Sequence, residues 1–280
     1  MTTTLDCGGR TLDLSRPCVM GILNVTPDSF SDGGVFVGAD QALAHARQME
    51  ADGAAIIDVG GESTRPGSRG VSVDEELSRV IPVLEALHGE VSVPLSVDTS
   101  KPAVMRAAVD AGAGLINDVM ALRRDGALAA ARDLGVPVCL MHMQGTPETM
   151  QDKPSYQHVV KEVVAFLLER VEAAEAAGIE RCKLMLDPGF GFGKTDPHNA
   201  ELLKGLPELV GHGLPVLAGL SRKSLVGRVL GRAMEERLAG SVALATMATM
   251  HGARIIRAHD VRETVDAVRL VNYVMAAQGA

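Results

Sequence analysis

Eight short apolar runs, rich in Val, Ile and Leu, recur along the chain, and longer segments with helical periodicity separate them. The runs are hydrophobic at nearly every position rather than at alternate positions, as expected for strands that are covered on both faces. This pattern predicts a parallel sheet whose strands are connected by crossover helices. The predicted strands are Val19 to Val25, Ala54 to Val59, Leu95 to Asp98, Gly114 to Val119, Val136 to Met141, Lys183 to Asp187, Pro215 to Gly219 and Ala253 to Ala258.

Helix boundaries can be predicted where a capping residue precedes a periodic segment. The expected starting residues of three helices are Asp40, Asp74 and Asp260. Glu263 would complete a capping box with Asp260. Pro82 should kink the second of these helices or shorten its first turns, because proline lacks a backbone N–H. A further helix is expected over residues 156 to 177, where apolar side chains recur at roughly helical spacing.

Eight strand–helix units in about 250 residues match the size of a TIM barrel. The predicted fold class is therefore α/β, a single TIM (β/α)8 barrel with a short N-terminal hairpin. Residues 1–16 are expected to form the hairpin extension and residues 17–280 the barrel. The main alternative, a doubly wound open sheet with a dinucleotide site, needs Gly-x-Gly-x-x-Gly after an early strand, and no such motif is found there.

The composition limits the partners and the compartment. The chain has 27 Lys and Arg against 35 Asp and Glu, which gives a net charge of −8. This charge argues against nucleic-acid binding, because binding to a phosphate backbone needs a clustered excess of basic residues. The four cysteines include no Cys-x-x-Cys pair, so neither a disulfide framework nor a zinc site is indicated. No signal peptide or membrane-spanning run is visible. We therefore expect a soluble, cytoplasmic protein with no nucleic-acid or membrane partner.

Polar residues follow almost every predicted strand, which is where the chemistry of a TIM barrel lies. Each one alone has a structural explanation, such as a helix cap for an Asp or packing for a His. Their concentration at one end of the barrel is harder to explain in that way. The residues are Asn24, Thr64, Arg65, Asp98, Asn117, Asp118, His142, Asp187, Ser221 to Ser224, Arg257 and His259.

These polar residues divide into two chemical groups. The cationic or donor-rich group comprises Arg65, Arg257, His259 and Ser221 to Ser224. This group favours an anionic ligand, and such barrels often hold a phosphate after their last two strands. The second group comprises Asp98, Asn117 and Asp187. Its acceptors suit the edge of a heterocycle with adjacent N–H groups, so the two groups together predict a phosphorylated heterocycle.

Three glycine-rich segments need separate interpretation. Residues 24–34 and 60–68 form long loops after the first two strands, and such loops often close over a substrate and exclude water. Their composition is equally typical of ordinary surface loops. The third segment, Pro188 to Thr195, is not a nucleotide-binding P-loop, because Pro188 stands where the motif requires glycine.

Five motifs occur along the chain in an order typical of one enzyme family. They are Met20 to Gly34, Asp58 to Gly67, Asp187 to Lys194, Ser221 to Ser224 and Arg257 to Asp260. They are spread over nearly the whole chain and together resemble the dihydropteroate synthases, the folate-pathway enzymes that sulfonamides inhibit. The resemblance implies condensation of hydroxymethyl-dihydropterin diphosphate with para-aminobenzoate, which gives dihydropteroate and releases diphosphate with the help of Mg²⁺.

The resemblance also implies a role for individual residues. The pterin pocket would be formed by Asp98, Asn117, Asp187 and Lys223. The diphosphate site would be formed by Asn24, Arg65, Arg257 and His259, with Asn24 also a ligand of Mg²⁺. The para-aminobenzoate site would be formed by Phe30, Thr64, Pro66, Phe190 and Ser224. Sulfonamides are the implied inhibitors, and a homodimer formed through late helices is the implied assembly.

The implied catalytic residues are Asp98, Lys223, Arg257 and His259. Positive groups and Mg²⁺ would stabilise the charge on the departing diphosphate. Asp98 would stabilise the positive charge on the pterin methylene that remains, so no side-chain nucleophile is needed. Magnesium keeps several waters, which fits the lack of a dense carboxylate cluster in the sequence.

Two other functions stay open from the sequence. A related pterin-binding methyltransferase domain would share the acidic pocket, but it has no use for Arg257 and His259 or for the two long loops. A non-catalytic paralogue that binds pterin or a partner protein would be expected to lose Asn24, Arg65 or His259, and all three are present.

Overall fold

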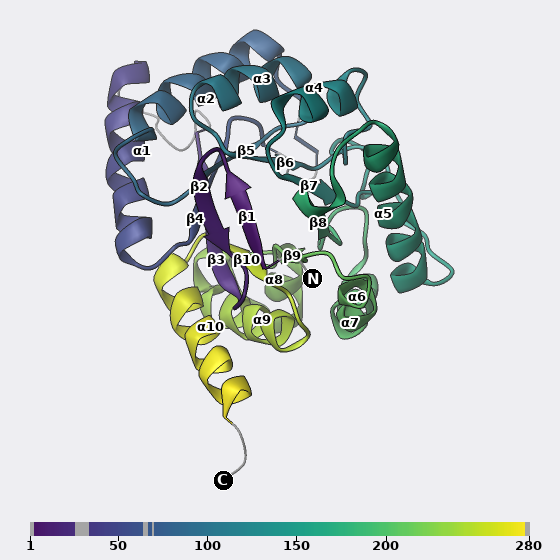
Figure 1. Cartoon of the computed structure of the whole chain (residues 1–280). Helices are drawn as coiled ribbons and strands as arrows, with labels where there is room; N and C mark the ends of the chain where they lie inside the picture. The colour runs from purple at the N-terminus through teal and green to yellow at the C-terminus, as the bar shows by residue number, and fades with distance from the viewer. Residues whose placement is uncertain (1–2, 26–33, 64–66, 69, 278–280) are drawn as a thin grey trace.

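The strands of the molecule lie at its centre and the helices surround them (Figure 1). The computed structural model describes residues 3–25, 34–63, 67–68 and 70–277. Within these residues, none of the helices has the length and apolar character that crossing a membrane requires.

The central sheet of the described residues has eight parallel strands in the order β8-β7-β6-β5-β4-β3-β10-β9. The strands are β3 (Cys18–Asn24), β4 (Ile56–Gly60), β5 (Leu95–Asp98), β6 (Leu115–Asp118), β7 (Val138–Met141), β8 (Leu184–Asp187), β9 (Leu217–Ala218) and β10 (Ile255–Ala258). A parallel bridge between Leu186 and Val216 joins β8 to the segment that leads into β9. The predicted TIM barrel is confirmed, and each predicted apolar run overlaps one strand.

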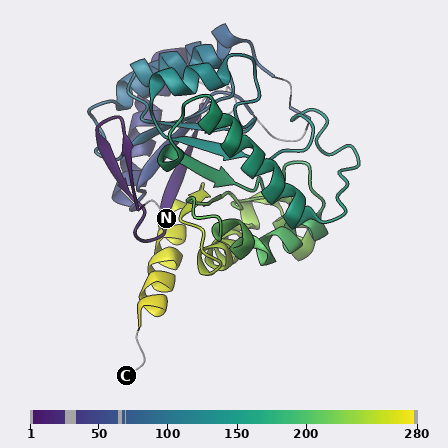
Figure 2. The same cartoon turned by 45° about the vertical axis from the view of Figure 1, so that its right-hand side comes forward.

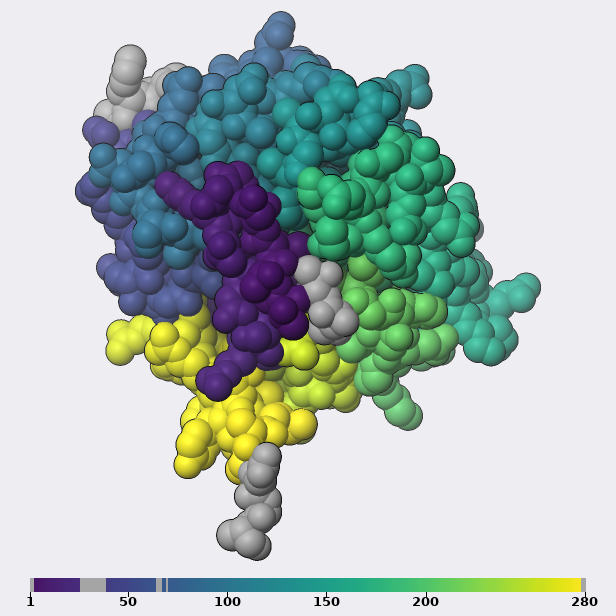
Figure 3. Space-filling view, in the orientation of Figure 1, coloured from purple at the N-terminus to yellow at the C-terminus, as the bar shows by residue number. Residues whose placement is uncertain are grey.

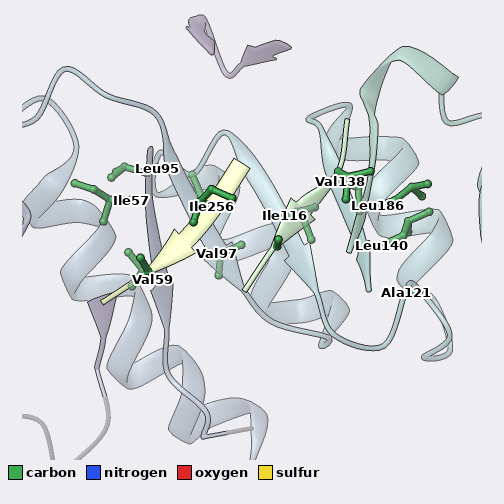
Figure 4. Packing of buried hydrophobic residues seen from close by; sticks show 14 of the residues in the cluster. Ile57, Val59, Leu95, Val97, Ile116, Ala121, Val138, Leu140, Leu186 and Ile256 are labelled. Carbon is green, nitrogen blue, oxygen red and sulfur yellow. The ribbon is translucent and has the colours of Figure 1, made fainter. Parts of the chain in front are cut away.

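Helices follow the strands and form the outer layer. They are α1 (Gly34–Ala51), α2 (Val73–Leu87), α3 (Pro102–Asp110), α4 (Ala127–Leu134), α5 (Val159–Ala176), α6 (Asp196–Lys204), α7 (Leu206–Val210), α8 (Ser224–Leu230), α9 (Leu238–Met250) and α10 (Val261–Ala276), with short 3-10 turns at Arg181–Lys183 and Met234–Glu236. The main core lies between the strands and this layer, where Leu140 and Leu186 pack side by side on neighbouring strands (Figure 4).

A two-stranded hairpin precedes the barrel, as predicted. Strands β1 (Thr4–Cys7) and β2 (Arg10–Asp13) pair antiparallel, and the hairpin lies across the middle of one face (Figure 3). Its buried side chains Leu5 and Leu12 share an apolar cluster with residues from the beginnings of the barrel strands. At Gly114 the contact is so close that a Cβ atom would lie 2.1 Å from the Cys7 carbonyl oxygen. The hairpin therefore closes the amino end of the barrel.

The predicted helix starts were less accurate than the predicted strands. Asp40 does not cap a helix, because α1 already begins at Gly34. Helix α2 is capped by Ser72 Oγ, which accepts the Glu75 N–H at 3.2 Å, so Asp74 is not its cap. Helix α2 also continues past Pro82 to Leu87 without a shortened first turn.

The predicted capping box at the start of α10 is also wrong. Asp260 occupies the N-cap position, but its side chain makes no capping hydrogen bond. Its carboxylate instead accepts hydrogen bonds from the Arg222 guanidinium, with Nε at 3.1 Å. The Asp260 carboxylate thus binds Arg222 instead of a backbone N–H of the first helical turn, because charge-assisted hydrogen bonds are stronger than neutral ones.

Candidate active site

Side chains that face the barrel interior change from apolar to polar within two residues along several strands. The apolar interior layer includes Ile56, Leu115, Met185 and Ile255, which belong to the cluster under the hairpin. Because side chains alternate along a strand, the next interior positions toward the carboxyl end are Asp58, Asn117, Asp187 and Arg257. The strand register therefore collects charged and amide groups at the carboxyl end, as expected for a TIM barrel site.

Arg257 is the centre of this polar layer. Its Nε donates to Asp58 Oδ2 at 2.7 Å and its NH2 group donates to Asp98 Oδ2 at 2.9 Å. Asn117 Nδ2 donates to the same Asp58 oxygen at 3.0 Å. Strands β4, β5, β6 and β10 thus contribute one side chain each to a connected cluster, and the predicted residues Asp98, Asn117 and Arg257 are brought together.

One guanidinium serves two buried carboxylates in this cluster. Burial raises the pKa of Asp98 to about 7; the Arg257 charge opposes this rise, and Asp58 adds to it. For Arg257 burial acts against the charge, but the attraction of Asp58 and Asp98 prevails and raises its pKa. Arg257 is therefore always charged, whereas Asp98 can gain or lose a proton near neutral pH.

Asp187 and Lys223 are buried groups of opposite charge that interact electrostatically with each other and with Arg257. Burial raises the pKa of Asp187, although its Oδ1 accepts the Gly189 N–H at 2.7 Å and Lys223 also favours the charged form. Burial lowers the pKa of Lys223 to about 8, against the attraction of Asp187. The Lys223 ammonium also lies 4.3 Å from the centre of the Phe192 ring, a distance typical of a cation–π contact.

His259 is held by Ser221 at the other side of Arg257. Ser221 Oγ accepts the backbone N–H of His259 at 3.2 Å and lies 3.0 Å from its Nδ1. Burial lowers the pKa of His259 to about 4, and the charges of Arg257 and Arg222 lower it further. The imidazole is neutral at pH 7. The Ser221 hydroxyl is placed to donate to Nδ1, and in that tautomer the Nε2 proton is available to donate to a ligand.

The remaining predicted residues differ in their environment. Asn24 ends β3 and pairs in register with Gly60, which itself pairs with Asp98, so it lies near the cluster at the strand ends. Ser224 is exposed and begins α8. Four predicted residues lie outside the described part of the chain: Phe30, Thr64, Arg65 and Pro66. Glu62, which lies two residues before Thr64, forms a salt bridge with the buried Lys101.

The two phenylalanines of the Gly-Phe-Gly-Phe segment occupy different environments. The predicted residue Phe190 is 1% exposed and belongs to the apolar core. A small cavity beside Lys223 and Ser224 borders both Phe190 and Gly191, but the Phe190 side chain itself is almost fully covered. Phe192 is partly exposed and faces Lys223. Phe192 is therefore the better placed of the two rings to meet a ligand.

Sequence reasoning assigned no role to Asp58. This residue lies inside an apolar run and looks like a strand residue, yet its carboxylate is fully buried and binds both Arg257 and Asn117. The sequence did hold one signal for a role. Asp58 lies two residues after Ile56 in the same strand, so its side chain must also face the barrel interior. A charged residue at an interior position near a strand end needs a partner.

No group of three or more His, Cys, Asp or Glu side chains in the described residues could enclose a metal ion. The donor set near the strand ends instead offers a hard amide oxygen from Asn24. A magnesium ion that keeps most of its waters needs few protein ligands of this kind. The residues present thus fit a weakly held Mg²⁺ that shares its coordination with a substrate.

The barrel with its polar carboxyl end belongs to the class of pterin binding enzymes, whose family model matches residues 20–259. A dihydropteroate synthase of Escherichia coli (strain K12) is 55% identical over 270 residues, which cover 96% of both chains. The chain therefore belongs to the dihydropteroate synthase family, whose members are transferases. Membership of this family removes the methyltransferase alternative.

Two solved structures agree with this assignment. The Xanthomonas albilineans dihydropteroate synthase with 4-aminobenzoic acid has a TM-score of 0.94 and 55% identity, covering 99% of this chain and 100% of the other. The Yersinia pestis dihydropteroate synthase in a sulfonamide drug complex has a TM-score of 0.94 and 55% identity, covering 98% and 100%. Both similarities extend over the hairpin as well as the barrel.

Proposed function

We propose that the active site at the carboxyl end of this barrel joins hydroxymethyl-dihydropterin diphosphate to para-aminobenzoate. The cluster around Arg257 would lie where the pterin ring of the substrate is joined to its diphosphate. The observation that carries this proposal is the contact of one guanidinium with both Asp58 and Asp98. These contacts use two of the five N–H groups of arginine, so donors remain for an anionic ligand.

The pterin ring would bind among Asp98, Asn117, Asp187 and Lys223. Carboxylate oxygens accept from the ring N–H groups, and the Lys223 ammonium donates to ring acceptor atoms. When the bond between the methylene carbon and the diphosphate oxygen breaks, its electron pair leaves with the diphosphate. The negative charge of Asp98 then stabilises the positive charge that develops on the pterin methylene.

The leaving group would be received by the cationic side of the site. Arg257 supplies a permanent charge, and neutral His259 supplies the Nε2 proton as a hydrogen-bond donor. We assign Asn24 as the protein ligand of Mg²⁺ and Arg65 as a further diphosphate contact. When bound, Mg²⁺ supplies charge neutralisation at the diphosphate oxygens.

The arylamine would approach from the side of Ser224 and Phe192. Its nitrogen forms a bond to the methylene carbon and loses one proton, which completes the reaction. We assign Phe192 to this pocket in place of Phe190, because the Phe190 ring is buried in the core. Thr64, Pro66 and Phe30 remain proposed contacts, and sulfonamides would compete for the same pocket.

A second copy of the chain is the proposed partner. In the described residues, large exposed apolar side chains gather on the late helices: Val229, Leu230, Met234, Leu238, Met247, Met250, Leu270, Tyr273, Val274 and Met275. Tyr273 is 79% exposed, and α10 extends beyond the barrel (Figures 1 and 2). Many exposed apolar side chains on neighbouring helices are typical of an interface. Sedimentation should show a dimer, and L270E should shift it toward the monomer.

The compartment is proposed to be the cytoplasm. All four cysteines lie in the described residues and are free thiols, and Cys7 and Cys139 are buried. Free thiols of this kind are typical of a reducing environment. Fractionation of cells that produce the tagged chain would test this assignment, and recovery outside the cytoplasm would contradict it.

The reaction itself can be tested directly. The protein is incubated with the pterin diphosphate, Mg²⁺ and para-aminobenzoate, and both diphosphate and dihydropteroate are quantified. Equal amounts of the two products are expected. Omission of para-aminobenzoate is the control and should abolish dihydropteroate. A protein that binds the pterin and releases no diphosphate would be the non-catalytic paralogue, and the proposed function would fail.

A further inference from the structure

Lys194 is a buried cation that the proposed reaction does not use. Its side chain is 1% exposed, and its ammonium donates to His142 Nδ1, Gly189 O and Phe192 O, each at 2.9 Å. An ammonium has three N–H donors, so each one has a single acceptor. No carboxylate in the described residues forms a salt bridge with Lys194, although burying a charge without one is unfavourable.

The acceptors of Lys194 show what this charge organises. Two of them are carbonyls of residues 189–193, the segment that follows β8, and this segment curves around the ammonium. Its glycines 189, 191 and 193 have φ of +67°, +81° and +61°, which L side chains rarely adopt. A Cβ at Gly189 would lie 1.9 Å from the His142 carbonyl oxygen, so this curve requires glycine at that position.

The third acceptor is a histidine with a fixed protonation state. Burial lowers the pKa of His142 to about 2, and the Lys194 charge lowers it further, so the ring is neutral and its Nδ1 can accept. Burial also lowers the pKa of Lys194 to about 7, with Asp187 opposing and Lys223 adding to the effect. Asp187 thus favours the Lys194 charge without a salt bridge to it, and among the direct contacts the two carbonyl oxygens of residues 189–193 are the groups that favour the charge.

The same segment supports two ligand-facing groups. Phe192 lies beneath the Lys223 ammonium, and the Gly191 backbone packs so closely on Lys223 that a Cβ there would lie 3.2 Å from its Cδ atom. The outer side of the segment is fixed by neutral side chains: Gln151 donates to Gly191 O at 2.8 Å and Tyr156 donates to Gly193 O at 2.7 Å. The Lys194 ammonium contacts the segment from within, where Asp187 Oδ1 also accepts the Gly189 N–H and Asn199 Oδ1 accepts the Gly191 N–H, each at 2.7 Å.

We infer that Lys194 is a positioning residue of the proposed arylamine pocket: its ammonium shapes residues 189–193 and thereby places Phe192 and, through it, Lys223. This inference rests on the proposed function for its kinetic consequence. Its structural part is independent of that function, because the segment and its contacts exist in the free protein.

The central test is K194M, which keeps the length of the side chain and removes its three donors. We expect the KM for para-aminobenzoate to rise about tenfold or more at saturating pterin, since small misplacements of binding groups have large effects, while kcat changes much less. Hydrogen exchange of residues 189–193 should become faster. The matched control is L5A at the opposite end of the barrel, which should lower stability without either effect.

Y156F guards against a K194M protein that does not fold. It removes one neutral contact to the same segment and should raise the same KM by a few fold. Unchanged KM and unchanged exchange in K194M, or equal effects in L5A, would overturn the inference. A third outcome separates the two proposals: K194M shows faster hydrogen exchange, but the wild-type protein makes no dihydropteroate. This result would support the positioning role and contradict only the proposed function.

Discussion

The two ends of the barrel are made from the same strands but differ in chemistry. At the amino end, Leu5 and Leu12 of the hairpin cover an apolar layer that includes Ile56 and Leu115. At the carboxyl end, two residues further along the strands, buried charges surround Arg257. The amino end can be packed for stability alone, whereas the carboxyl end carries unfavourable burial of charge that binding and catalysis require.

The largest effect is expected from R257A, which breaks the carboxyl end at its centre. Loss of the guanidinium removes a preorganised contact to the leaving group and should lower kcat/KM by on the order of 10²-fold or more. It also leaves Asp58 and Asp98 buried without their cation, so affinity for a pterin that lacks diphosphate should fall as well. Steady-state kinetics and calorimetry measure the two losses.

H259A is the control for that experiment. His259 contacts Ser221 and neither carboxylate, so this variant should impair use of the diphosphate substrate and leave binding of the free pterin nearly unchanged. If R257A and H259A lose the same affinity for a pterin that lacks diphosphate, the contacts of Arg257 with Asp58 and Asp98 have no special role in pterin binding.

The converse experiment breaks the amino end. L5A removes a 3% exposed side chain from the cluster under the hairpin and should lower the free energy of unfolding by about 2–5 kcal/mol. The kcat/KM measured well below the unfolding temperature should not change. The exposed neighbour Thr11 provides the control T11A, which should alter stability much less. A comparable fall in kcat/KM for L5A would show that the two ends are coupled.

A smaller effect concerns the pH dependence of stability. Because the pKa of Asp98 is raised to about 7 in the folded protein, the fold retains a proton that the unfolded chain has lost. The stability contributed by this group is present at pH 4 and is lost as pH rises toward 7. D98N cannot lose it, so it should gain about 1–2 kcal/mol relative to wild type between pH 5 and pH 8. Denaturant unfolding at both pH values measures the difference, and parallel pH profiles would contradict it.

The smallest effect is chemical and leaves activity unchanged. Burial raises the pKa of the Cys7 thiol to about 12, whereas Cys182 is exposed. A thiol reagent at neutral pH should therefore modify Cys182 at once and Cys7 only when the hairpin opens. Mass spectrometry over time gives both rates, with C182S as the control. Rapid labelling of Cys7 would mean that the amino end is not closed in solution.

The sequence predicted the strands well because strands that are buried on both faces leave continuous apolar runs. It predicted the polar strand ends for the same reason, since they interrupt those runs. Asp58 escaped attention because it lies within a run and its partner Arg257 is 199 residues away. Long-range pairing also explains the wrong capping box at Asp260, whose carboxylate binds Arg222.

The choice between Phe190 and Phe192 shows a different limit of the sequence. Both rings are flanked by glycine, so composition and local spacing cannot distinguish them. Their exposure depends on the left-handed turns of residues 189–193 around Lys194, which only the folded chain shows. Tertiary contacts determined which of the two rings is buried and which one is partly exposed beside Lys223.

The long-range contacts of Arg257 also bear on how the chain is made. Asp58 and Asp98 precede it by 199 and 159 residues. At roughly 5 to 20 residues per second, a ribosome would deliver the cation about 10 to 40 seconds after Asp58. Until then the incomplete barrel holds acidic side chains that cannot be buried with their native partner, and β3 lacks its neighbour β10. Synthesis of β10 therefore completes both the wall of the barrel and its reactive centre, and nascent chains halted before residue 255 should present an open, solvated edge to chaperones.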